Sequence, residues 1–384
     1  MIYSAPYIAI ITVFLICGGL AWNYRNNRTL QYTLIGVCAG LLVFFFGLRG
    51  FCFYDWNVYY PLYESKHWGN LLAPYSGQSA NLGFNLLMVV CKSIFDNYFF
   101  FQFVLTVINT YLLIRFLKKK VDNIPLTLAF VVCMGGLYIY TDLMRNGIAI
   151  LLFVNALEFI EKRRILPYFL ICLLALSFHK SSLLFFPLYF FLHRKINKWV
   201  YVSVFIAGNV ILLFKIPVFL NLVSLFAGFI SKDLQCQING YTILMNQVGF
   251  VISIGYLERL LTGVLVFIYM DRIRQLRADA NIFINSMLLY FFMFFFFSEF
   301  KTLSSRLSVL FCYSYWIIWP TLIRSFVYQG NRLLFIAFLT VYCLLKINGS
   351  TNTPVAKYEN VLFKHQPYHL RQIYFRKHFN DAKE

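Results

Sequence analysis

Long apolar runs recur along the chain and are separated by short polar connections. Many of these runs approach the length of about 20 residues that an α-helix needs to cross the hydrocarbon core of a bilayer. A transmembrane β-barrel would instead show alternating segments of about ten residues, and the sequence lacks that pattern. The hydrophobic pattern therefore predicts an all-α polytopic integral membrane protein with about 12 transmembrane helices.

The positions of the expected helices follow directly from the apolar runs. The run at 83–95 is short and contains Lys92, so we expect a re-entrant or interfacial helix there rather than a full span. Spans are expected at 8–22, 32–48, 98–117, 126–140, 147–161, 165–178, 183–192, 199–214, 249–270, 282–297, 307–323 and 333–345.

The polar connections define the expected organisation of the chain. Residues 1–347 are expected to form a single transmembrane catalytic domain, with long outside loops at about 49–82 and 215–248. The remaining residues, 348–384, are expected to form a basic and aromatic C-terminal tail. The sequence shows no internal repeat.

Composition and charge agree with a protein that is solvated by lipid. Only 13% of the residues are charged, whereas a soluble domain has about 25%. The net charge of +19 does not indicate nucleic-acid binding, because the basic residues gather in alternate connections, as the positive-inside rule requires. This arrangement places the N-terminus outside. The basic clusters are Arg25/Arg28, Lys118–Lys120, Lys162–Arg164, Arg194/Lys195/Lys198, Arg272/Arg274/Arg277 and Arg324/Arg332.

The outside connections carry a small set of ionisable residues at or near helix ends. Ionisable groups at membrane depth are costly and are candidates for function, and several arginines on one face suit a phosphate or diphosphate. Each residue also has a structural interpretation, since an arginine at a helix end can act as a snorkelling anchor and an aspartate as a turn residue. These residues are Arg49, Asp55, Asp142, Arg145, His179, Lys180, Glu299, Lys301 and Arg306.

Motifs of soluble nucleotide-dependent enzymes and of metal sites are missing from the sequence. We therefore expect no cofactor and no metal, and any donor substrate should be lipid-borne and reached within the membrane.

Short motifs in the outside segments provide a family resemblance. They occur in the order Arg49-Gly50 with Asp55 and Tyr59-Tyr60, Asn81-Leu82-Gly83-Phe84, Arg145-Asn146-Gly147-Ile148-Ala149, His179-Lys180-Ser181-Ser182, and Arg306 opening a span that ends at Pro320. This ordered set resembles the EpsG family of Wzy-type polysaccharide polymerases, which make O-antigen, capsule or exopolysaccharide. Two departures are that Asp55 follows Phe-Cys-Phe-Tyr instead of a Gly-x-Asp turn, and that Asn81 replaces an acidic residue.

The resemblance implies a glycosyltransferase that joins polyprenyl-diphosphate-linked oligosaccharide repeat units on the outer face of the bacterial cytoplasmic membrane. The implied partners are the lipid-linked donor and acceptor, the lipid bilayer and a chain-length regulator, with no nucleic acid. Arg145 and Arg306 are expected to bind the diphosphate, with Arg49 as a third candidate. His179 is the first choice for general base because imidazole titrates near neutrality. The further candidates are Asp55 and Glu299 for the base, and Lys180, Tyr59, Tyr60 and Asn81 for substrate binding.

Two other classes of function remain open from the sequence. A flippase or transporter for the same lipid-linked oligosaccharide would also place arginines in a cavity, although transporters usually show internal repeats. A membrane ligase or acyltransferase would use a different acceptor. The appearance of a glycan ladder from lipid-linked repeat units distinguishes a polymerase from both.

Overall fold

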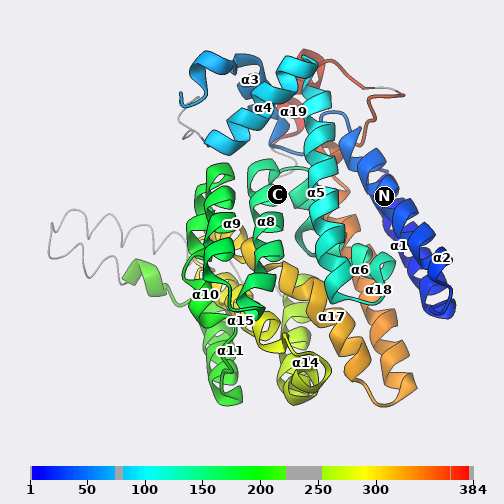
Figure 1. Ribbon diagram of the computed structural model, residues 1–384, viewed down its shortest axis with the longest axis vertical. Coiled ribbons are helices and arrows are strands. Elements are labelled where there is room, and N and C mark those ends of the chain that lie inside the picture. Colours follow the sequence, from blue (N-terminus) through cyan, green and yellow to red (C-terminus); the bar gives the residue numbers. More distant parts are fainter. Residues whose placement is uncertain (1, 74–80, 222–252, 364, 380–384) are drawn as a thin grey trace, which may run out of the picture. The chain divides into compact units, whose positions relative to one another are not determined.

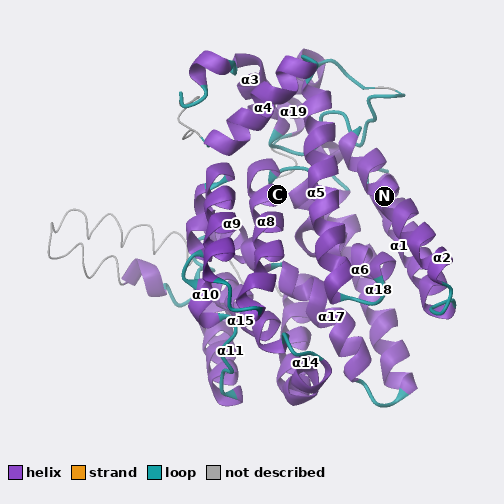
Figure 2. Ribbon diagram, in the orientation of Figure 1, coloured by secondary structure: helices purple, strands orange, loops and turns teal. Residues whose placement is uncertain are grey.

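The structure is a computed structural model that describes residues 2–73, 81–221, 253–363 and 365–379. Within these ranges every regular element is a helix (Figures 1 and 2), and the β-type pairing consists of one isolated antiparallel bridge between Arg49 and Asn360. The predicted all-α architecture is therefore confirmed for the described residues. Most of the expected loop at 215–248 and the start of the expected span at 249–270 lie outside them.

The chain divides into two compact units, which are described separately: Met1–Tyr189 with Gly330–Glu384, and Phe190–Gln329. Whether they form the one catalytic domain expected from the sequence stays a prediction. The α-helices of the first unit are α1 (Ala5–Asn23), α2 (Arg28–Leu42), α3 (Trp56–Ser65), α4 (Leu82–Ile94), α5 (Tyr98–Lys120), α6 (Ile124–Val131), α7 (Leu137–Tyr140), α8 (Met144–Glu161), α9 (Ile165–Phe178), α18 (Gln329–Thr351) and α19 (Tyr368–His378), with α10 (Leu188–Phe191) at the boundary. The second unit contains α11 (Lys198–Leu213), α14 (Ile254–Leu276), α15 (Ala280–Phe296), α16 (Lys301–Ser308) and α17 (Tyr313–Ser325).

Asparagine side chains begin several of these helices. Asn97 Oδ1 accepts from the N–H of Phe99 at 2.8 Å at the start of α5, and Asn123 Oδ1 accepts from Leu126 N at 3.0 Å at the start of α6. Such caps satisfy backbone donors that the first helical turn leaves without partners. They explain why these helices begin at the polar connections, where the apolar pattern changes.

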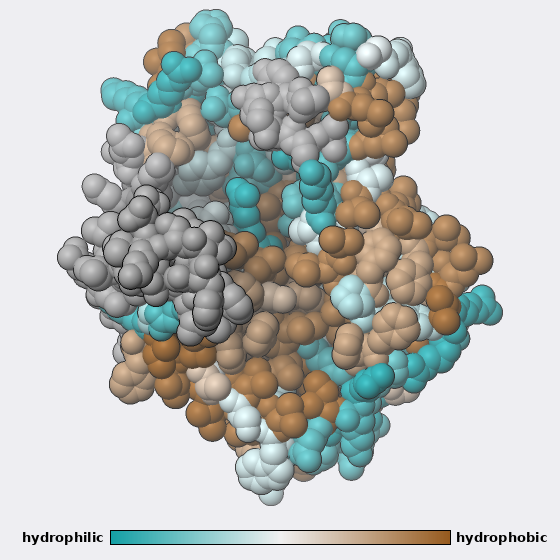
Figure 3. Space-filling model, turned by 90° about the vertical axis from the view of Figure 1, so that its left-hand side faces the viewer, coloured by the Kyte–Doolittle hydropathy of each residue, from teal (hydrophilic) through white to brown (hydrophobic). Residues whose placement is uncertain are grey.

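The described helices include membrane spans, as expected. Four are long and apolar enough to cross a bilayer, and a fifth span results if the pair Thr302–Phe311 and Tyr313–Ser325, bent by 56°, is counted as one. Further apolar helices of 10–17 residues include α9, α11 and α15. Apolar side chains form a broad area on the face shown in Figure 3, which suits contact with lipid. The chain is thus a polytopic membrane protein, and the count of about 12 spans stays a prediction.

Two segments differ from the helices expected from the apolar pattern. The expected span at 183–192 is a 3-10 helix, Lys180–Phe185, followed by the four-residue α10. Pro187 lies at the break, where a proline provides no backbone N–H and disfavours a continuous α-helix. The expected loop 49–82 contains α3, a helix rich in tyrosine that has Pro61 in its interior.

Helix α4 lies against the end of α9 and crosses it obliquely (Figure 1), in keeping with the short helix expected at 83–95. The contact depends on Gly83, because a Cβ atom there would lie 2.3 Å from Ser177 Oγ and 3.2 Å from the ring of Phe178. A larger residue at this position would force Ser177 and Phe178 to move. Glycine therefore lets the start of α4 approach the residues that directly precede His179.

The segment after α18 folds back on the connection between α2 and α3. Gly50 N donates to Glu359 O at 2.7 Å, Phe53 N to Val355 O at 3.0 Å, and Val361 N to Leu48 O at 2.8 Å. These bonds place the C-terminal segment on the same side of the membrane as the connection that follows α2.

The buried side chain of Arg371, in α19, holds this C-terminal segment in place through contacts with residues 355–359. Its guanidinium is 1% exposed and lies 3.7 Å from Glu359 Oε1. It also donates to the carbonyl oxygens of Lys357 at 3.1 Å and Val355 at 3.3 Å. One buried arginine thus forms an ion pair with a carboxylate and hydrogen bonds with two backbone carbonyls.

Replacing Arg371 with alanine tests how strongly this arrangement holds the segment. The change leaves Lys357, at 3.5 Å, as the remaining cation beside the nearly buried Glu359 and removes the donor of two carbonyls. We therefore expect the free energy of unfolding to fall by about 3 kcal/mol. Thermal unfolding of the purified protein in detergent measures the effect. Arg376→Ala, at an exposed position of the same helix, is the control and should change stability by less than about 0.5 kcal/mol. Equal effects of the two substitutions would contradict this role for Arg371.

Candidate active site

The connection between α2 and α3 is buried although it is not helical. Phe51, Cys52 and Phe53 are at most 3% exposed, so their backbone groups require protein partners. Besides the bonds to the C-terminal segment, Asp142 Oδ1 accepts from Tyr54 N at 2.9 Å and from Asp55 N at 3.1 Å. Asp142 thereby attaches the start of α3 to the turn that precedes α8.

Arg49 is a buried part of this connection. Its side chain is 3% exposed and donates to Phe46 O at 2.5 Å and Thr141 O at 3.3 Å. Gln102 Nε2 in turn donates to the backbone carbonyl of Arg49 at 2.8 Å. The guanidinium therefore holds two turns together, and its expected contact with a diphosphate stays a prediction.

Asp142 belongs to the ionisable residues that the sequence places in the outside connections, but the sequence assigned it no role in the site. Burial raises the pKa of its carboxyl group to about 6, although the two backbone donors and nearby Arg49 act in the opposite direction. Its place three residues before Arg145 was visible in the sequence, but its partners Tyr54 and Asp55 are 88 and 87 positions away. No local pattern indicates such a contact.

Helix α3 brings Tyr59 to Arg145, the second residue of α8. Arg145 Nε donates to Tyr59 Oη at 3.1 Å, and the guanidinium carbon lies 5.2 Å from the centre of the tyrosine ring. Burial raises the pKa of the Tyr59 phenol, and the Asp55 carboxylate acts in the same direction. The phenol therefore keeps its proton and remains able to donate. Phe84 of α4 packs against the same ring, with centroids 5.5 Å apart.

A second hydrogen-bonded series joins α8 to the turn after α9. Asn146, which is 5% exposed, lies next to Arg145, and its Oδ1 accepts from Ser181 Oγ at 3.1 Å. Ser181 Oγ lies 2.7 Å from His179 Nδ1. The motifs containing Arg145 and His179, which are distant in the sequence, thus meet through Asn146 and Ser181. We call Tyr59, Arg145, Asn146, His179 and Ser181 the polar cluster.

The hydrogen positions in this series decide what His179 can do. When Ser181 gives its hydroxyl proton to Asn146 Oδ1, His179 Nδ1–H can donate to Ser181 Oγ, and Nε2 keeps a lone pair for use as a base. In the other arrangement Nδ1 accepts, including from Ser181 N at 3.2 Å, and Nε2 carries the proton. The acceptor at Asn146 favours the first arrangement, and the N–H of Ser181 favours the second.

The remaining candidates of the first unit lie in different surroundings. Tyr60 stacks on Tyr368 of α19 with centroids 4.4 Å apart, so it contributes to packing of the C-terminal segment. Asn81 is 6% exposed and precedes α4, where its backbone carbonyl accepts from Asn85 N. Lys180 is exposed beside His179. The expected substrate contacts of these residues stay predictions.

Glu299 and Arg306 belong to the second unit. Glu299 accepts from Phe219 N at 2.7 Å and from Leu220 N at 3.3 Å, and burial raises its pKa. Arg306 lies in α16 and is exposed. The expected pairing of Arg306 with Arg145, and the role of Glu299 as a base, stay predictions. Among the described residues of both units, no three side chains from His, Cys, Asp and Glu gather as a metal ion would require.

The raised pKa of Asp142 predicts a pH dependence of stability. The folded protein binds the proton of Asp142 more tightly than the unfolded chain does. The protonated carboxyl group therefore contributes fully to the free energy of unfolding below about pH 4, and this contribution is lost as the pH rises through about 6. We expect the contribution of Asp142, measured by thermal unfolding in detergent, to be about 1 kcal/mol smaller at pH 7 than at pH 5. Asp142→Asn keeps an acceptor for both N–H groups and should remove this component, whereas Asp122→Asn, at an exposed position, should not. An unchanged pH profile in Asp142→Asn would refute the assignment.

The sequence was compared with those of known protein families, and the match covers this part of the chain. A sequence model of the EpsG family matches residues 32–363, which include every segment that contributes to the polar cluster. No curated protein and no solved structure shows a significant match to the chain. The match extends over most of the sequence and confirms the resemblance in its motifs. The chain therefore belongs to the EpsG family.

Proposed function

We propose that this protein is a polysaccharide polymerase, a glycosyltransferase that joins polyprenyl-diphosphate-linked oligosaccharide repeat units. The observation that carries the proposal is the polar cluster, in which a cation held by Tyr59 and an imidazole oriented by Ser181 come from distant segments to neighbouring positions. Membership of the EpsG family supports the same class of reaction.

In the proposed reaction, a hydroxyl group of the incoming repeat unit attacks the anomeric carbon of the growing glycan. The new glycosidic bond forms as the bond from that carbon to the lipid diphosphate breaks. The products are the longer glycan on its acceptor lipid and the released polyprenyl diphosphate. A single displacement of this kind inverts the anomeric configuration.

Arg145 is assigned to the diphosphate. A guanidinium stabilises the negative charge that develops on the leaving oxygen, and its effect is largest when it is held in place before the reaction. The bond from Arg145 Nε to Tyr59 Oη supplies that orientation. Asp142 holds the start of α3, and Arg49 bonds to the carbonyl of the preceding residue, Thr141. We therefore assign both residues a positioning role behind Tyr59.

His179 is assigned as the general base that accepts the proton of the attacking hydroxyl. Its Nδ1 lies 2.7 Å from Ser181 Oγ, and when Nδ1 donates there, Nε2 is the basic nitrogen of the ring. Asp55, at the start of α3, is the alternative base within the first unit.

We further propose that the reaction takes place on the extracytoplasmic side of the bacterial cytoplasmic membrane. The basic clusters that mark cytoplasmic connections occur in alternate loops of the sequence. The connections that contain Arg49, Arg145 and His179 are the others. No metal ion is part of the proposed reaction.

Polymerisation in a purified system tests the role of Arg145. Lipid-linked repeat units are incubated with the protein in detergent, and the glycan ladder and released polyprenyl diphosphate are quantified. We expect Arg145→Ala to lower the rate by at least about 100-fold and Arg145→Lys to retain part of it. Arg164→Ala, an exposed arginine after α8, is the matched control and should keep full activity. If the intact wild-type protein forms no glycan ladder, the polymerase proposal is refuted.

The pH dependence of the same reaction tests His179. A base must be deprotonated to act, so the wild-type rate should rise with pH until the imidazole is neutral. His179→Ala should lower the rate by about 100-fold or more and abolish that rise, while Ser181→Ala should keep a rise but shift its midpoint. His369→Ala, an exposed histidine on α19, should match wild type. A pH profile that His179→Ala leaves unaltered would exclude His179 as the base.

A further inference from the structure

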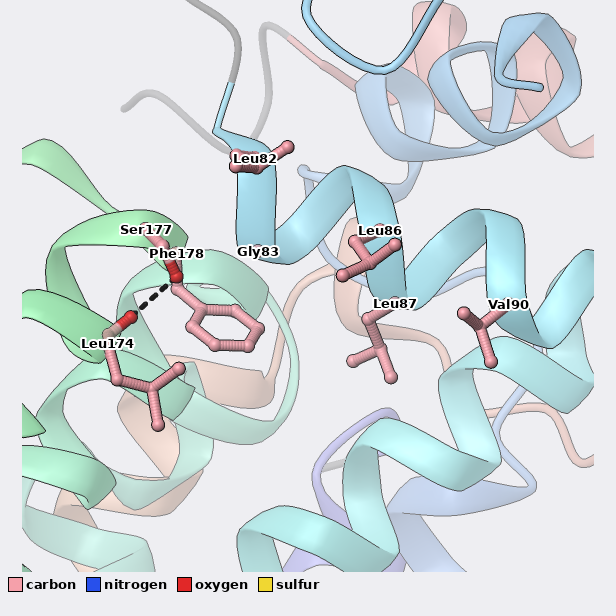
Figure 4. Close-up of a pocket in the computed structure, with 8 residues that line it drawn as sticks. All are labelled: Leu82, Gly83, Leu86, Leu87, Val90, Leu174, Ser177 and Phe178. Atoms are coloured by element: carbon pink, nitrogen blue, oxygen red, sulfur yellow. Dashed lines mark hydrogen bonds between the residues drawn. The ribbon is translucent and has the colours of Figure 1, made fainter. Parts of the chain in front are cut away.

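An apolar groove lies between α4 and the end of α9, within the first unit. Its volume is about 360 Å³, within the range of about 300–1,000 Å³ typical of ligand sites. One wall is the face of α4 from Leu82 to Val90, and the other is formed by Leu174, Ser177 and Phe178 of α9 (Figure 4).

The groove presents a hydrocarbon surface. Ser177 is its single lining residue with a polar side chain, and this hydroxyl donates to Leu174 O of its own helix at 2.7 Å, as the dashed line in Figure 4 shows. A ligand in the groove is therefore recognised by its apolar surface rather than by hydrogen bonds to Ser177.

One end of the groove adjoins the polar cluster. Phe178, which lines the groove, directly precedes His179, and Phe84, next to Gly83 on α4, packs against the ring of Tyr59. The close approach at Gly83 fixes this adjacency, because α4 could not lie so near Ser177 with a larger residue. A molecule with an apolar chain in the groove would thus present its polar head to the cluster.

The outer rim of the groove is open. Leu86 is 41% exposed, Val90 38% and Leu174 48%. In a protein surrounded by lipid, such a rim lets a chain enter sideways from the bilayer without leaving a hydrocarbon environment.

We propose that this groove binds the isoprenoid units next to the diphosphate of the lipid-linked substrate. The inference rests on the proposed function and adds the site of the lipid chain to it. A diphosphate attached directly to the first isoprene unit suits a groove whose end meets Arg145 and His179 through the polar cluster, because the anionic head follows the apolar chain without a spacer. The acyl chains of bilayer phospholipids, which a glycerol unit separates from the phosphate, are the competing occupant.

Photolabelling locates the chain directly. The probe is a polyprenyl diphosphate without sugar that has a diazirine on its first isoprene units, added to the full-length protein in nanodiscs of phosphatidylethanolamine and phosphatidylglycerol. We expect the label on peptides of α4 and α9, and we expect unlabelled polyprenyl diphosphate to displace it. A label distributed over other helices, or displaced equally well by added phosphatidylglycerol, would overturn the proposal.

Two variants that fill the groove provide a matched test. Leu174→Trp fills it from α9 and Val90→Trp from α4, whereas Leu173→Trp places the same bulk on the neighbouring position, which is 53% exposed and does not line the groove. Each methylene excluded from the groove costs a factor of about four in affinity, so we expect labelling to fall at least about tenfold in both filling variants and to stay unchanged in Leu173→Trp. Equal labelling of all three, each checked by thermal unfolding, would overturn the groove assignment.

The ladder assay separates this inference from the proposed function. If the wild-type protein makes a ladder but the probe labels other sites, the groove assignment fails and the polymerase proposal stands. If the probe labels the groove but no ladder forms, the polymerase proposal fails and the groove remains a site for a prenyl diphosphate.

Discussion

A buried connection without helical hydrogen bonds is the constraint on which the first unit depends. The backbone donors of Gly50, Phe53, Tyr54 and Asp55 cannot be satisfied within the connection, and an unsatisfied buried N–H is costly, above all beside a bilayer. The C-terminal segment supplies two carbonyl acceptors, and Asp142 supplies one carboxylate oxygen for the other two. Satisfying these donors brings three distant parts of the chain together.

The orientation of the polar cluster follows from that constraint. Once the start of α3 is attached to the turn before α8, Tyr59 lies one helical turn further along α3 and reaches Arg145 on α8. Asn146 then connects α8 to Ser181 and His179. The packing of α4 at Gly83 adds the apolar groove to the same region. The two hydrogen-bonded series, one through Tyr59 and one through Ser181, therefore meet at the adjacent residues Arg145 and Asn146 of α8.

Some elements could be predicted from the sequence because they depend on local properties. The expected helix at 165–178 coincides with α9, since an uninterrupted apolar run ends there at polar residues. The prediction of a continuous span at 183–192 was wrong. Pro187 interrupts the helix there, although the run is apolar. Helix α3 was missed because its tyrosines and Pro61 resemble a loop, and its stability comes from partners such as Tyr368 and Phe375 of α19.

The residues of the candidate site also fall into two groups, those that the sequence could indicate and those that depend on long-range contacts. Arg145 and His179 could be singled out because ionisable residues at the ends of apolar runs are unusual. The contribution of Asp142, and the engagement of Arg49 with backbone carbonyls, depend on contacts between residues about 90 positions apart. A single sequence contains no periodicity that would report such contacts.

The pairing of segments far apart in the sequence has a consequence for biosynthesis. Tyr7 donates to the carbonyl of Ala356, a contact that spans 349 positions, and the connection after α2 shares its backbone bonds with residues 355–361. These partners can meet only after α18 and the residues that follow it have left the ribosome. The backbone donors of Gly50 and Phe53 must therefore stay without these carbonyl partners while the helices between them are inserted. The order of synthesis thus sets the order in which the first unit can be completed.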